Sequence, residues 1–268
     1  MRIAVVGATG RIGRQLCPAV ERAGHEPVRI SRALGADVLT GEGLDAALNG
    51  VDAVIDVINA PSRQEDEAVE FFAAATRTLL AAERRVGVRH HVVLSALGLD
   101  HGRHVPHYAG KRIQERLVSA KDVPSTVLRS AQLHDFPAML ATRLARGGIA
   151  EVPPLLLQPI APADLVDVLV EVAVGRPLRA VREVAGPRTE DLVDMARRTL
   201  GVLGRPLELA PTWRGVFGAE LAGDAMLPSD DARICPTTFD RWLADLRVVR
   251  DDGRVPRHRA QLAVGQPV

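Results

Sequence analysis

Gly7-Ala8-Thr9-Gly10-Arg11-Ile12-Gly13 is the stretch of sequence that decides the fold. It follows the apolar run Ile3–Val6 and precedes a segment with helical periodicity that extends to Ala23. A strand, a glycine-rich turn and a helix in this order are typical of a dinucleotide-binding α/β domain. The three glycines would permit a sharp turn, close backbone approach to a pyrophosphate and tight packing of the helix on the strand. We expect the pyrophosphate at the helix N-terminus, with contacts from Gly7, Thr9, Gly10, Arg11, Ile12 and Gly13.

The segments that follow alternate between strand and helix patterns. This alternation predicts a Rossmann-type doubly wound parallel sheet, with right-handed crossovers between strands. A ligand of such a sheet binds beyond the carboxyl ends of the strands. The expected strands are 2–6, 27–31, 51–57, 89–95 and 125–129, and the expected helices are 11–23, 44–48, 64–85 and 107–119.

After about residue 130 the alternation of strand and helix patterns becomes less regular, and prolines become frequent. Helices are expected at 164–174, at 189–200 with Thr189 as N-cap, and at 238–246 with Thr237 or Thr238 as cap. A short strand is expected at 181–185. We therefore predict a dinucleotide-binding core over 1–135, a smaller substrate-binding lobe over 136–250 that is integrated with the core, and a loosely held tail over 251–268.

The composition argues against a nucleic-acid-binding or membrane protein. The 268 residues are 47% hydrophobic and carry 34 basic and 33 acidic side chains, a net charge of +1. This balance offers no field for nucleic acid or an anionic membrane, and no apolar run reaches membrane-spanning length. Two widely spaced cysteines suit a reducing compartment. With the first strand starting at about residue 2, we expect no signal peptide and a cytoplasmic protein.

The end of the second expected strand indicates which dinucleotide is preferred. An NAD site usually has an acidic residue there, which binds the adenosine 2′-hydroxyl. This chain has Ile30-Ser31-Arg32 instead. Arg32 could hold a 2′-phosphate with its guanidinium fork, and Arg11 could add a second cation. We expect NADP(H) to be preferred over NAD(H), with Ser31 and Arg32 in the site. The alternative is that both arginines are solvated surface residues.

Over residues 1–245 the chain resembles the atypical short-chain dehydrogenases/reductases, specifically the NmrA-like NAD(P)H-binding proteins. That branch includes NADPH-dependent reductases, redox-neutral tailoring enzymes and non-catalytic NADP sensors. The resemblance implies that Asp37 and Val38 border the adenine, and that Asn59, Ala60 and Pro61 line the path to the nicotinamide ribose. The matching motifs are Gly7–Gly13, Asp37–Leu44, Asp56–Ser62, His90–Ser95, Ala109–Glu115, Gln158–Ala161 and Ala185–Pro187.

The resemblance also implies a catalytic Tyr four residues before a Lys that holds the ribose. Lys111 fits, but His107 stands four residues before it, and Tyr108, the chain's single tyrosine, stands three before it. His107 is a chemically reasonable substitute, because the ordinary histidine pKa lies near the working pH. Ser95 is the candidate for the family's catalytic Ser/Thr. Lys111, His107, Tyr108 and Ser95 are therefore the candidate catalytic residues.

The loop after the fifth expected strand would reach the substrate in this family. Gln132, His134 and Trp213 are the candidate substrate-binding residues, and His134 could act as an acid or base. For His134, a polar loop role is the structural alternative. Three histidines recur at His101, His104 and His107, but Gly102 and Pro106 interrupt any helix there, so we expect no metal. The pair His90-His91 opens a strand and is interpreted as edge or surface structure.

The function predicted from these features is NADPH-dependent reduction of a small organic molecule, namely a quinone, a carbonyl compound or a conjugated double bond. One alternative is a non-catalytic NADP(H)-binding redox sensor. Another is a redox-neutral tailoring enzyme that keeps NADP as a scaffold. A small-molecule substrate is the expected partner, and the expected oligomeric state is monomer or homodimer.

Overall fold

The computed structural model describes residues 1–62, 64–120, 123–215 and 217–251. These residues form two compact units. The first comprises 1–99, 105–130 and 165–182, and the second comprises 100–104, 131–164 and the described residues from 183 onward. Residues 165–182 thus belong to the first unit, although sequence grouped them with the C-terminal lobe. The tail expected over 251–268 lies outside the described residues except for Asp251.

A seven-stranded sheet has the strand order β11-β8-β5-β4-β3-β1-β2. Neighbouring strands from β2 to β5 run parallel, as do β8 and β11. The chain order reverses between β1 and β3, so the expected ligand position lies at their carboxyl ends. The strands are β1 (Arg2–Val6), β2 (Glu26–Ile30), β3 (Ala53–Asp56), β4 (His90–Ala96), β5 (Ser125–Ser130), β8 (Val181–Ala185) and β11 (Arg233–Ile234).

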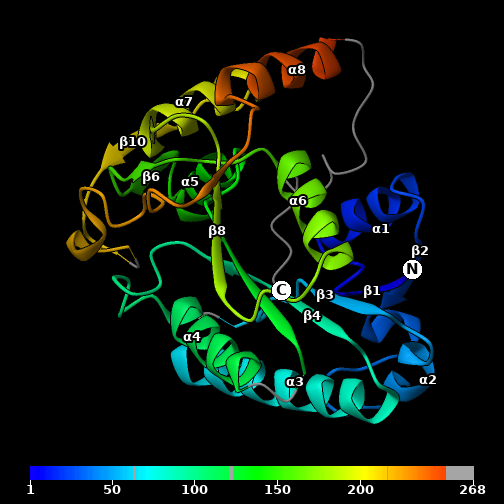
Figure 1. Ribbon diagram of the computed structural model, residues 1–268. Coiled ribbons are helices and arrows are strands. Elements are labelled where there is room, and N and C mark those ends of the chain that lie inside the picture. The colour runs from blue at the N-terminus through cyan, green and yellow to red at the C-terminus, as the bar shows by residue number, and fades with distance from the viewer. Residues whose placement is uncertain (63, 121–122, 216, 252–268) are drawn as a thin grey trace. The chain divides into compact units, whose positions relative to one another are not determined.

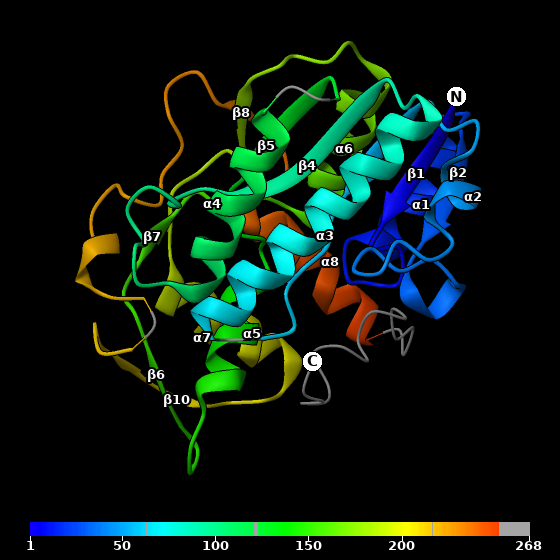
Figure 2. The ribbon, with the colours of Figure 1, turned by 90° about the horizontal axis from the view of Figure 1, so that it is seen from below.

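Helices of the first unit cover both faces of its strands. Figure 1 shows α3 (Glu65–Val86) and α4 (Pro106–Ser119) below the sheet, and α1 (Gly13–Arg22) and α6 (Pro162–Val174) above it. Figure 2 shows α3 and α4 side by side from below. The short α2 (Leu44–Leu48) completes the set. The doubly wound arrangement expected from the sequence is therefore confirmed.

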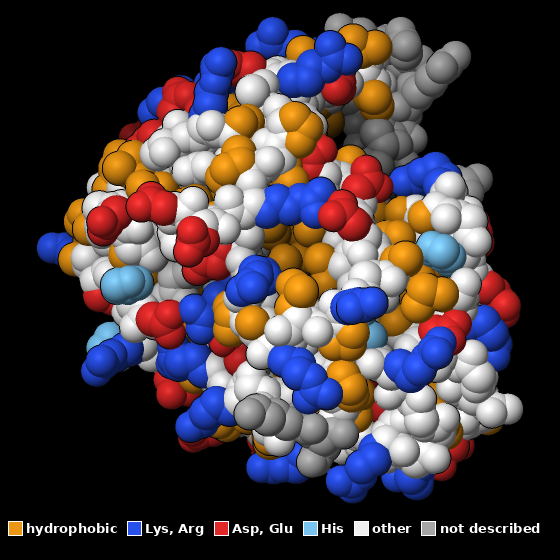
Figure 3. Space-filling model, in the orientation of Figure 1, with side chains coloured by type: hydrophobic (Ala, Val, Ile, Leu, Met, Phe, Trp, Pro, Cys, Tyr) orange, Lys and Arg blue, Asp and Glu red, His pale blue; other side chains and the backbone are white. Residues whose placement is uncertain are grey.

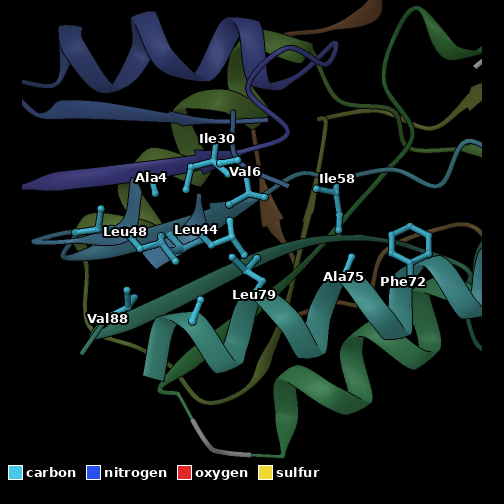
Figure 4. Close-up of a cluster of buried hydrophobic side chains, with 14 residues drawn as sticks. Ala4, Val6, Ile30, Leu44, Leu48, Ile58, Phe72, Ala75, Leu79 and Val88 are labelled. Carbon is cyan, nitrogen blue, oxygen red and sulfur yellow. The ribbon is translucent and has the colours of Figure 1, made fainter. Parts of the chain in front are cut away.

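The apolar face of α3 builds the core beneath β1 and β3. Phe72, Ala75 and Leu79 are fully buried and lie at helical spacing. Figure 4 shows Leu79 facing Val6 of β1, and Ala75 facing Ile58 in the loop after β3. Three acidic residues in the first turn and two arginines in the last complement the helix dipole. Gly87, with φ +80°, ends the helix in the left-handed conformation.

The described residues of the second unit form short paired strands and three helices. β6 (Ile149–Val152) runs parallel to β10 (Glu208–Pro211), and β7 (Leu156–Leu157) runs antiparallel to β9 (Glu190–Asp191). These strands were not predicted, because two to four residues are too few for a clear alternation. The helices of this unit are α5 (Phe136–Leu144), α7 (Leu192–Leu203) and α8 (Phe239–Asp251). A 3₁₀ turn, η2 (Ala219–Leu221), also lies in this unit, and another, η1 (Arg32–Leu34), lies in the first unit.

Two local predictions were wrong. Thr189 does not cap α7: the helix starts later, and the Asp191 carboxylate accepts from the N–H of Asp194 at 2.8 Å. His90 and His91 do not lie on an edge or the surface, because β4 is a central strand and both side chains are buried. His91 binds the buried Glu83 carboxylate with Nδ1 at 2.8 and 3.0 Å from its two oxygens. That partner made burial of a polar histidine possible.

Charged side chains of both signs are interspersed on the face shown in Figure 3. Within the described ranges, no helix has the length and apolar character needed to cross a bilayer.

Candidate functional site

The glycine-rich turn connects β1 to α1 through two close backbone approaches. Gly7 has φ +88°, and a Cβ there would lie 3.2 Å from the carbonyl carbon and oxygen of Val57, just past β3. A Cβ on Gly13 would lie only 2.1 Å from the Gly7 carbonyl oxygen. Both positions therefore require glycine. The turn is closed by the Gly10 N–H, which donates to the Gly7 carbonyl at 2.9 Å.

The turn presents the start of α1 at the point where the strand order reverses. The N–H groups of Gly7 and Ala8 donate to the Ile30 carbonyl of β2 at 3.0 and 3.2 Å, which ties the turn to the sheet. Helix α1 starts at Gly13, two residues later than predicted, so residues 9–12 form a loop before the first helical turn. Thr9 and Gly10 are exposed. An anion placed there would meet helix N–H groups and the positive end of the helix dipole.

The end of β2 carries an unusual polar atom. Within the described part of the chain, the Ser31 hydroxyl is buried and has no hydrogen-bond partner. Arg32 follows it on the exposed turn η1 and Arg11 is partly exposed. A buried hydroxyl without a partner costs free energy unless a ligand satisfies it. Ser31 and Arg32 thus fit a ligand that brings hydrogen-bonding oxygens to this end of the sheet.

The next loop is shaped by Asp37. Its carboxylate accepts from the N–H of Leu39 at 2.8 Å, and its backbone N–H and C=O bind the Glu42 carbonyl and the Gly41 N–H. Val38 is partly buried in the core cluster beneath β1 and β3. The Asp37 side chain therefore stabilises the turn in which it stands. The apolar side chain of Val38 could still contact the adenine ring expected here.

The loop after β3 follows the fully buried Asp56. Asn59 and Pro61 are exposed in that loop, and Ala60 is partly buried. The Ile58 N–H donates to Asp56 Oδ1 at 3.0 Å, which fixes the start of the loop. The loop thus begins beside the Gly7 turn, as its place after β3 predicts.

Lys111 of α4 is only 5% exposed, and its side chain donates to backbone and side-chain oxygens. Its Nζ donates to the Leu94 carbonyl at 2.7 Å, to Gln114 Oε1 at 2.8 Å and, over a longer 3.4 Å, to the Ile58 carbonyl. It also lies 4.7 Å from the centre of the Phe72 ring, a cation–π distance. Burial lowers the pKa of Lys111 to about 8, against the opposing attraction of Asp56 and Glu115. At pH 7 the Lys111 side chain is therefore mainly in its ammonium form.

His107 lies on the same face of α4 and packs on the same ring. Its imidazole meets Phe72 edge to face, with 5.6 Å between ring centres. Desolvation, with a smaller contribution from the Lys111 charge, lowers the pKa of His107 to about 3. The imidazole is thus neutral at pH 7. Tyr108 is only 3% exposed, with its ring centre 6.5 Å from that of His107.

Gly110 brings α4 close enough to α3 for these contacts. A Cβ there would lie 2.4 Å from Phe72 Cδ2 and 2.9 Å from the Ala68 carbonyl oxygen. Sequence reasoning missed this role, although a glycine in the middle of a helix is the signal that could have found it. Ser95, on β4 next to Leu94, has a buried hydroxyl without a partner in the described structure. The Ser95 hydroxyl near the carboxyl end of β4, like the Ser31 hydroxyl after β2, could therefore bind a ligand.

The expected substrate residues all belong to the second unit. His134 is fully buried, and its Nε2 donates to the Pro159 carbonyl at 3.1 Å. Its ring packs edge to face against Phe239 and Trp242, and burial lowers its pKa to about 4. This environment is that of a core histidine. The partly exposed candidates in this unit are Gln132 and Trp213.

Comparison with known proteins agrees with this geometry. A family profile described as NAD(P)H-binding matches residues 7–174. The (4-alkanoyl-5-oxo-2,5-dihydrofuran-3-yl)methyl phosphate reductase of Streptomyces griseus is 31% identical over 246 residues, covering 84% of this chain and 82% of the relative. The photosystem II assembly factor Ycf39 of Synechocystis is 28% identical over 49% of this chain and 44% of its own length.

Solved structures show the same fold. MoeE5 in complex with UDP-glucose and NAD superposes with a TM-score of 0.70 at 18% identity, covering 95% of this chain and 100% of that one. A short-chain dehydrogenase/reductase superfamily protein from Agrobacterium tumefaciens with bound NAD also gives 0.70, at 17% identity, covering 97% and 100%. Because the family profile matches residues 7–174 and the reductase relative is 31% identical, the chain belongs to the NAD(P)H-binding, NmrA-like branch of the atypical short-chain dehydrogenases/reductases. It is an oxidoreductase of that type.

Proposed function

We propose that the protein is an NADPH-dependent reductase that acts on a carbon–carbon double bond conjugated to a carbonyl group. The observation that carries the proposal is the extent of similarity to the Streptomyces griseus reductase, which is 31% identical over 82% of that protein. The ring named in that protein's substrate has its double bond between C3 and C4, beside the C5 carbonyl and the alkanoyl group. Of the acceptors considered from the sequence, the conjugated double bond fits this relative best.

The residues of the first unit fit NADP(H). The Gly7–Gly13 turn and the start of α1 suit the pyrophosphate, since a Cβ at Gly7 or Gly13 would meet backbone. The buried Ser31 hydroxyl has no partner in the described structure, and Arg32 beside it is exposed. A 2′-phosphate would accept from both, whereas an acidic residue would repel it. These features support NADPH over NADH.

Lys111 and the β4 end fit the nicotinamide half. When bound, NADPH supplies a hydride from its nicotinamide C4. We place the ribose hydroxyls near the Lys111 ammonium and the Ser95 hydroxyl, both of which lie at or beside the carboxyl end of β4. Asn59, Ala60 and Pro61 would line the approach from β3, and Asp37 and Val38 would border the adenine.

The reduction also needs one proton, and none of the candidate catalytic residues that the structure describes is a strong acid. Hydride addition to the carbon β to a carbonyl leaves the electron pair on an enolate, which takes its proton at the α carbon. A second carbonyl on the α carbon delocalises this charge, so water suffices as the proton source. His107 is neutral at pH 7 because burial lowers its pKa to about 3. Such a substrate therefore matches a site without the family's tyrosine in register.

Gln132 and Trp213 are our candidates for substrate contact, since both are partly exposed in the second unit. His134 is fully buried and donates to Pro159, so we assign it to support of that loop rather than to proton transfer.

The test is nicotinamide absorbance with purified protein and NADPH while candidate acceptors are added. The panel holds a 2-alkanoyl butenolide with and without a phosphate ester, a quinone and a simple ketone. The proposal expects oxidation with the butenolides and much slower oxidation with the ketone. Tight NADPH binding without oxidation by any acceptor contradicts the reductase and favours a redox sensor.

A further inference from the structure

We propose that Gln114 is a positioning residue for the cofactor: its amide joins Asp56 to Lys111 and holds the Lys111 ammonium at the ends of β3 and β4. This inference rests on the proposed function for its cofactor role. Gln114 is fully buried in α4, one helical turn from Lys111. A glutamine is rarely buried without a full set of partners, so its contacts define what it does.

The hydrogen bonds of Gln114 fix the orientation of its amide. Its Nε2 donates to Asp56 Oδ2 at 2.9 Å, and its Oε1 accepts from Lys111 Nζ at 2.8 Å. An ionised carboxylate can only accept and an ammonium can only donate. The reversed amide would place two acceptors together and two donors together. The positive NH₂ end of the amide therefore faces Asp56, and its negative oxygen faces Lys111. In this orientation the amide, polarised by the carboxylate, stabilises the ammonium form of Lys111.

Asp56 is itself held rigidly. It is fully buried at the end of β3, and its other oxygen, Oδ1, accepts from the Ile58 N–H at 3.0 Å. The Ile58 carbonyl faces back to Lys111. Asp56, Gln114, Lys111 and Ile58 thus close a ring of contacts. This ring links the loop after β3 to helix α4, two of the elements expected around the nicotinamide ribose.

The Lys111 ammonium has three N–H donors, and the protein supplies three oxygens. Two contacts, to Leu94 and Gln114, are at normal hydrogen-bond distances of 2.7 and 2.8 Å, and the third, to Ile58, is 3.4 Å. The longest contact is the weakest. The donor directed at Ile58 is therefore the one that a ribose hydroxyl can take over, while Gln114 and Leu94 keep the nitrogen in place.

Charged groups around Lys111 come from several elements. Asp56 of β3 and Glu115 of α4 favour the ammonium, while burial disfavours it. Glu115 is already paired with Arg129 of β5 through both oxygens, at 2.9 and 2.8 Å. His107, on the same helix face, is neutral near pH 7. The Phe72 ring of α3 adds a cation–π contact. Asp56 also raises the pKa of the buried His91 of β4, but Gln114 connects its carboxylate directly to Lys111.

The first experiment titrates Lys111 in the full chain. Lys111 and Lys121 are the only lysines, so lysine labelled with carbon-13 at Cε gives two signals in an NMR titration, assigned with Lys111→Arg. Gln114→Met keeps the length of the side chain but removes the accepting oxygen. We expect the pKa of Lys111 to fall by about one unit, a tenfold loss of ammonium at a given pH. Gln114→Glu keeps an accepting oxygen and should hold the pKa at or above that of the wild type.

The matched control is Gln64→Met, the same substitution at an exposed residue that precedes α3. It should leave the Lys111 titration unchanged. A merely structural Gln114 would lower stability in both Gln114 variants without moving the pKa of Lys111 in opposite directions. An unchanged pKa in Gln114→Met therefore overturns the inference. If Gln114→Met does not fold, Gln114→Glu decides: a pKa below that of the wild type overturns it.

The second experiment separates the two halves of the cofactor. We expect Gln114→Met to raise the Kd for NADPH about tenfold and the Kd for adenosine 2′,5′-bisphosphate, which lacks the nicotinamide ribose, by less than about twofold. Equal loss for both ligands overturns the inference. Normal wild-type binding of NADPH with no change in Gln114→Met contradicts the inference alone. Absence of NADPH binding by the wild type contradicts the proposed function, and the cofactor role of Gln114 with it.

Discussion

Gly13 lies so close to Gly7 that a Cβ on Gly13 would be 2.1 Å from the Gly7 carbonyl oxygen and 2.7 Å from the Ala8 Cα. The contact is between backbone atoms, which cannot rotate away as a side chain can. It sets the distance between the end of β1 and the start of α1. The same distance decides whether an anion can reach the first N–H groups of the helix.

Gly13→Ala should therefore disrupt both the fold and the cofactor site. The added methyl must push α1 away from the turn, at a cost of about 2 kcal/mol or more in the free energy of unfolding. We expect the Kd for NADPH to rise at least about tenfold, because the helix N-terminus no longer faces the pyrophosphate. Chemical denaturation and a fluorescence titration measure the two effects. Gly201→Ala is the control, since Gly201 lies exposed in α7 with nothing within 4 Å of a Cβ.

Gly110→Ala tests the contact between α3 and α4. Alanine in a helix normally stabilises by about 0.5–1 kcal/mol relative to glycine, and Gly201→Ala should show this gain. At Gly110 the methyl meets Phe72 and the Ala68 carbonyl within 3 Å, so we expect net destabilisation of about 1–3 kcal/mol. Opposite signs for the two substitutions, measured by urea unfolding, support the packing described. A stabilised Gly110→Ala would contradict it.

Arg32→Glu should reverse the cofactor preference. A guanidinium–phosphate pair strengthens binding by about 1.5–3 kcal/mol, and a carboxylate repels the phosphate. We expect the Kd for NADPH to rise by about tenfold or more, and the Kd for NADH to stay the same or fall. Arg77→Glu places the same change of charge on the exposed surface of α3 and controls for long-range repulsion. Equal weakening in both variants would mean that Arg32 does not contact the 2′-phosphate.

His134 should make the protein sensitive to acid. Its pKa is lowered to about 4 in the folded protein by burial, against about 6.5 in the unfolded chain. Between these values the unfolded chain binds a proton that the folded protein does not, so stability falls as pH drops from about 6.5 to 4. His134→Gln keeps a donor for Pro159 and removes the titration. The pH dependence of the unfolding free energy should then decrease by up to about one proton over this window.

A pH slope that is the same in wild type and His134→Gln would contradict burial of a neutral imidazole. His107 is lowered to about 3 and acts in the same direction. Its own substitution, His107→Gln, serves as the parallel measurement in the first unit.

The first unit was predictable because its sequence signals are local. Gly7, Gly10 and Gly13 mark a turn whose geometry admits few alternatives, and the apolar runs of β1, β3 and β4 are typical of strands buried on both faces. Gly24 and Gly87 mark the ends of their helices. Elements of this kind were located to within about two residues, the usual uncertainty of a helix boundary.

The features that sequence did not reveal depend on contacts between different elements of the fold. Glu83 stands only eight residues before His91, but its place on α3 does not show that its carboxylate is buried against the imidazole. Nothing near Gln114 shows that Asp56, on another strand, binds its amide. The low pKa of His107 follows from Phe72 and the burial of α4 against α3, which periodicity cannot supply. Strands of two residues, such as β7 and β9, exist only through their pairing.

The most direct test of the central claim is a titration of the purified protein with NADPH and with NADH, followed by addition of a 2-alkanoyl butenolide. The account predicts that NADPH binds at least about tenfold more tightly than NADH. It predicts that the butenolide oxidises bound NADPH, and that Gly13→Ala raises the Kd for both nucleotides at least about tenfold. Binding of neither nucleotide would contradict the assignment of the Gly7–Gly13 turn, and with it the reductase itself.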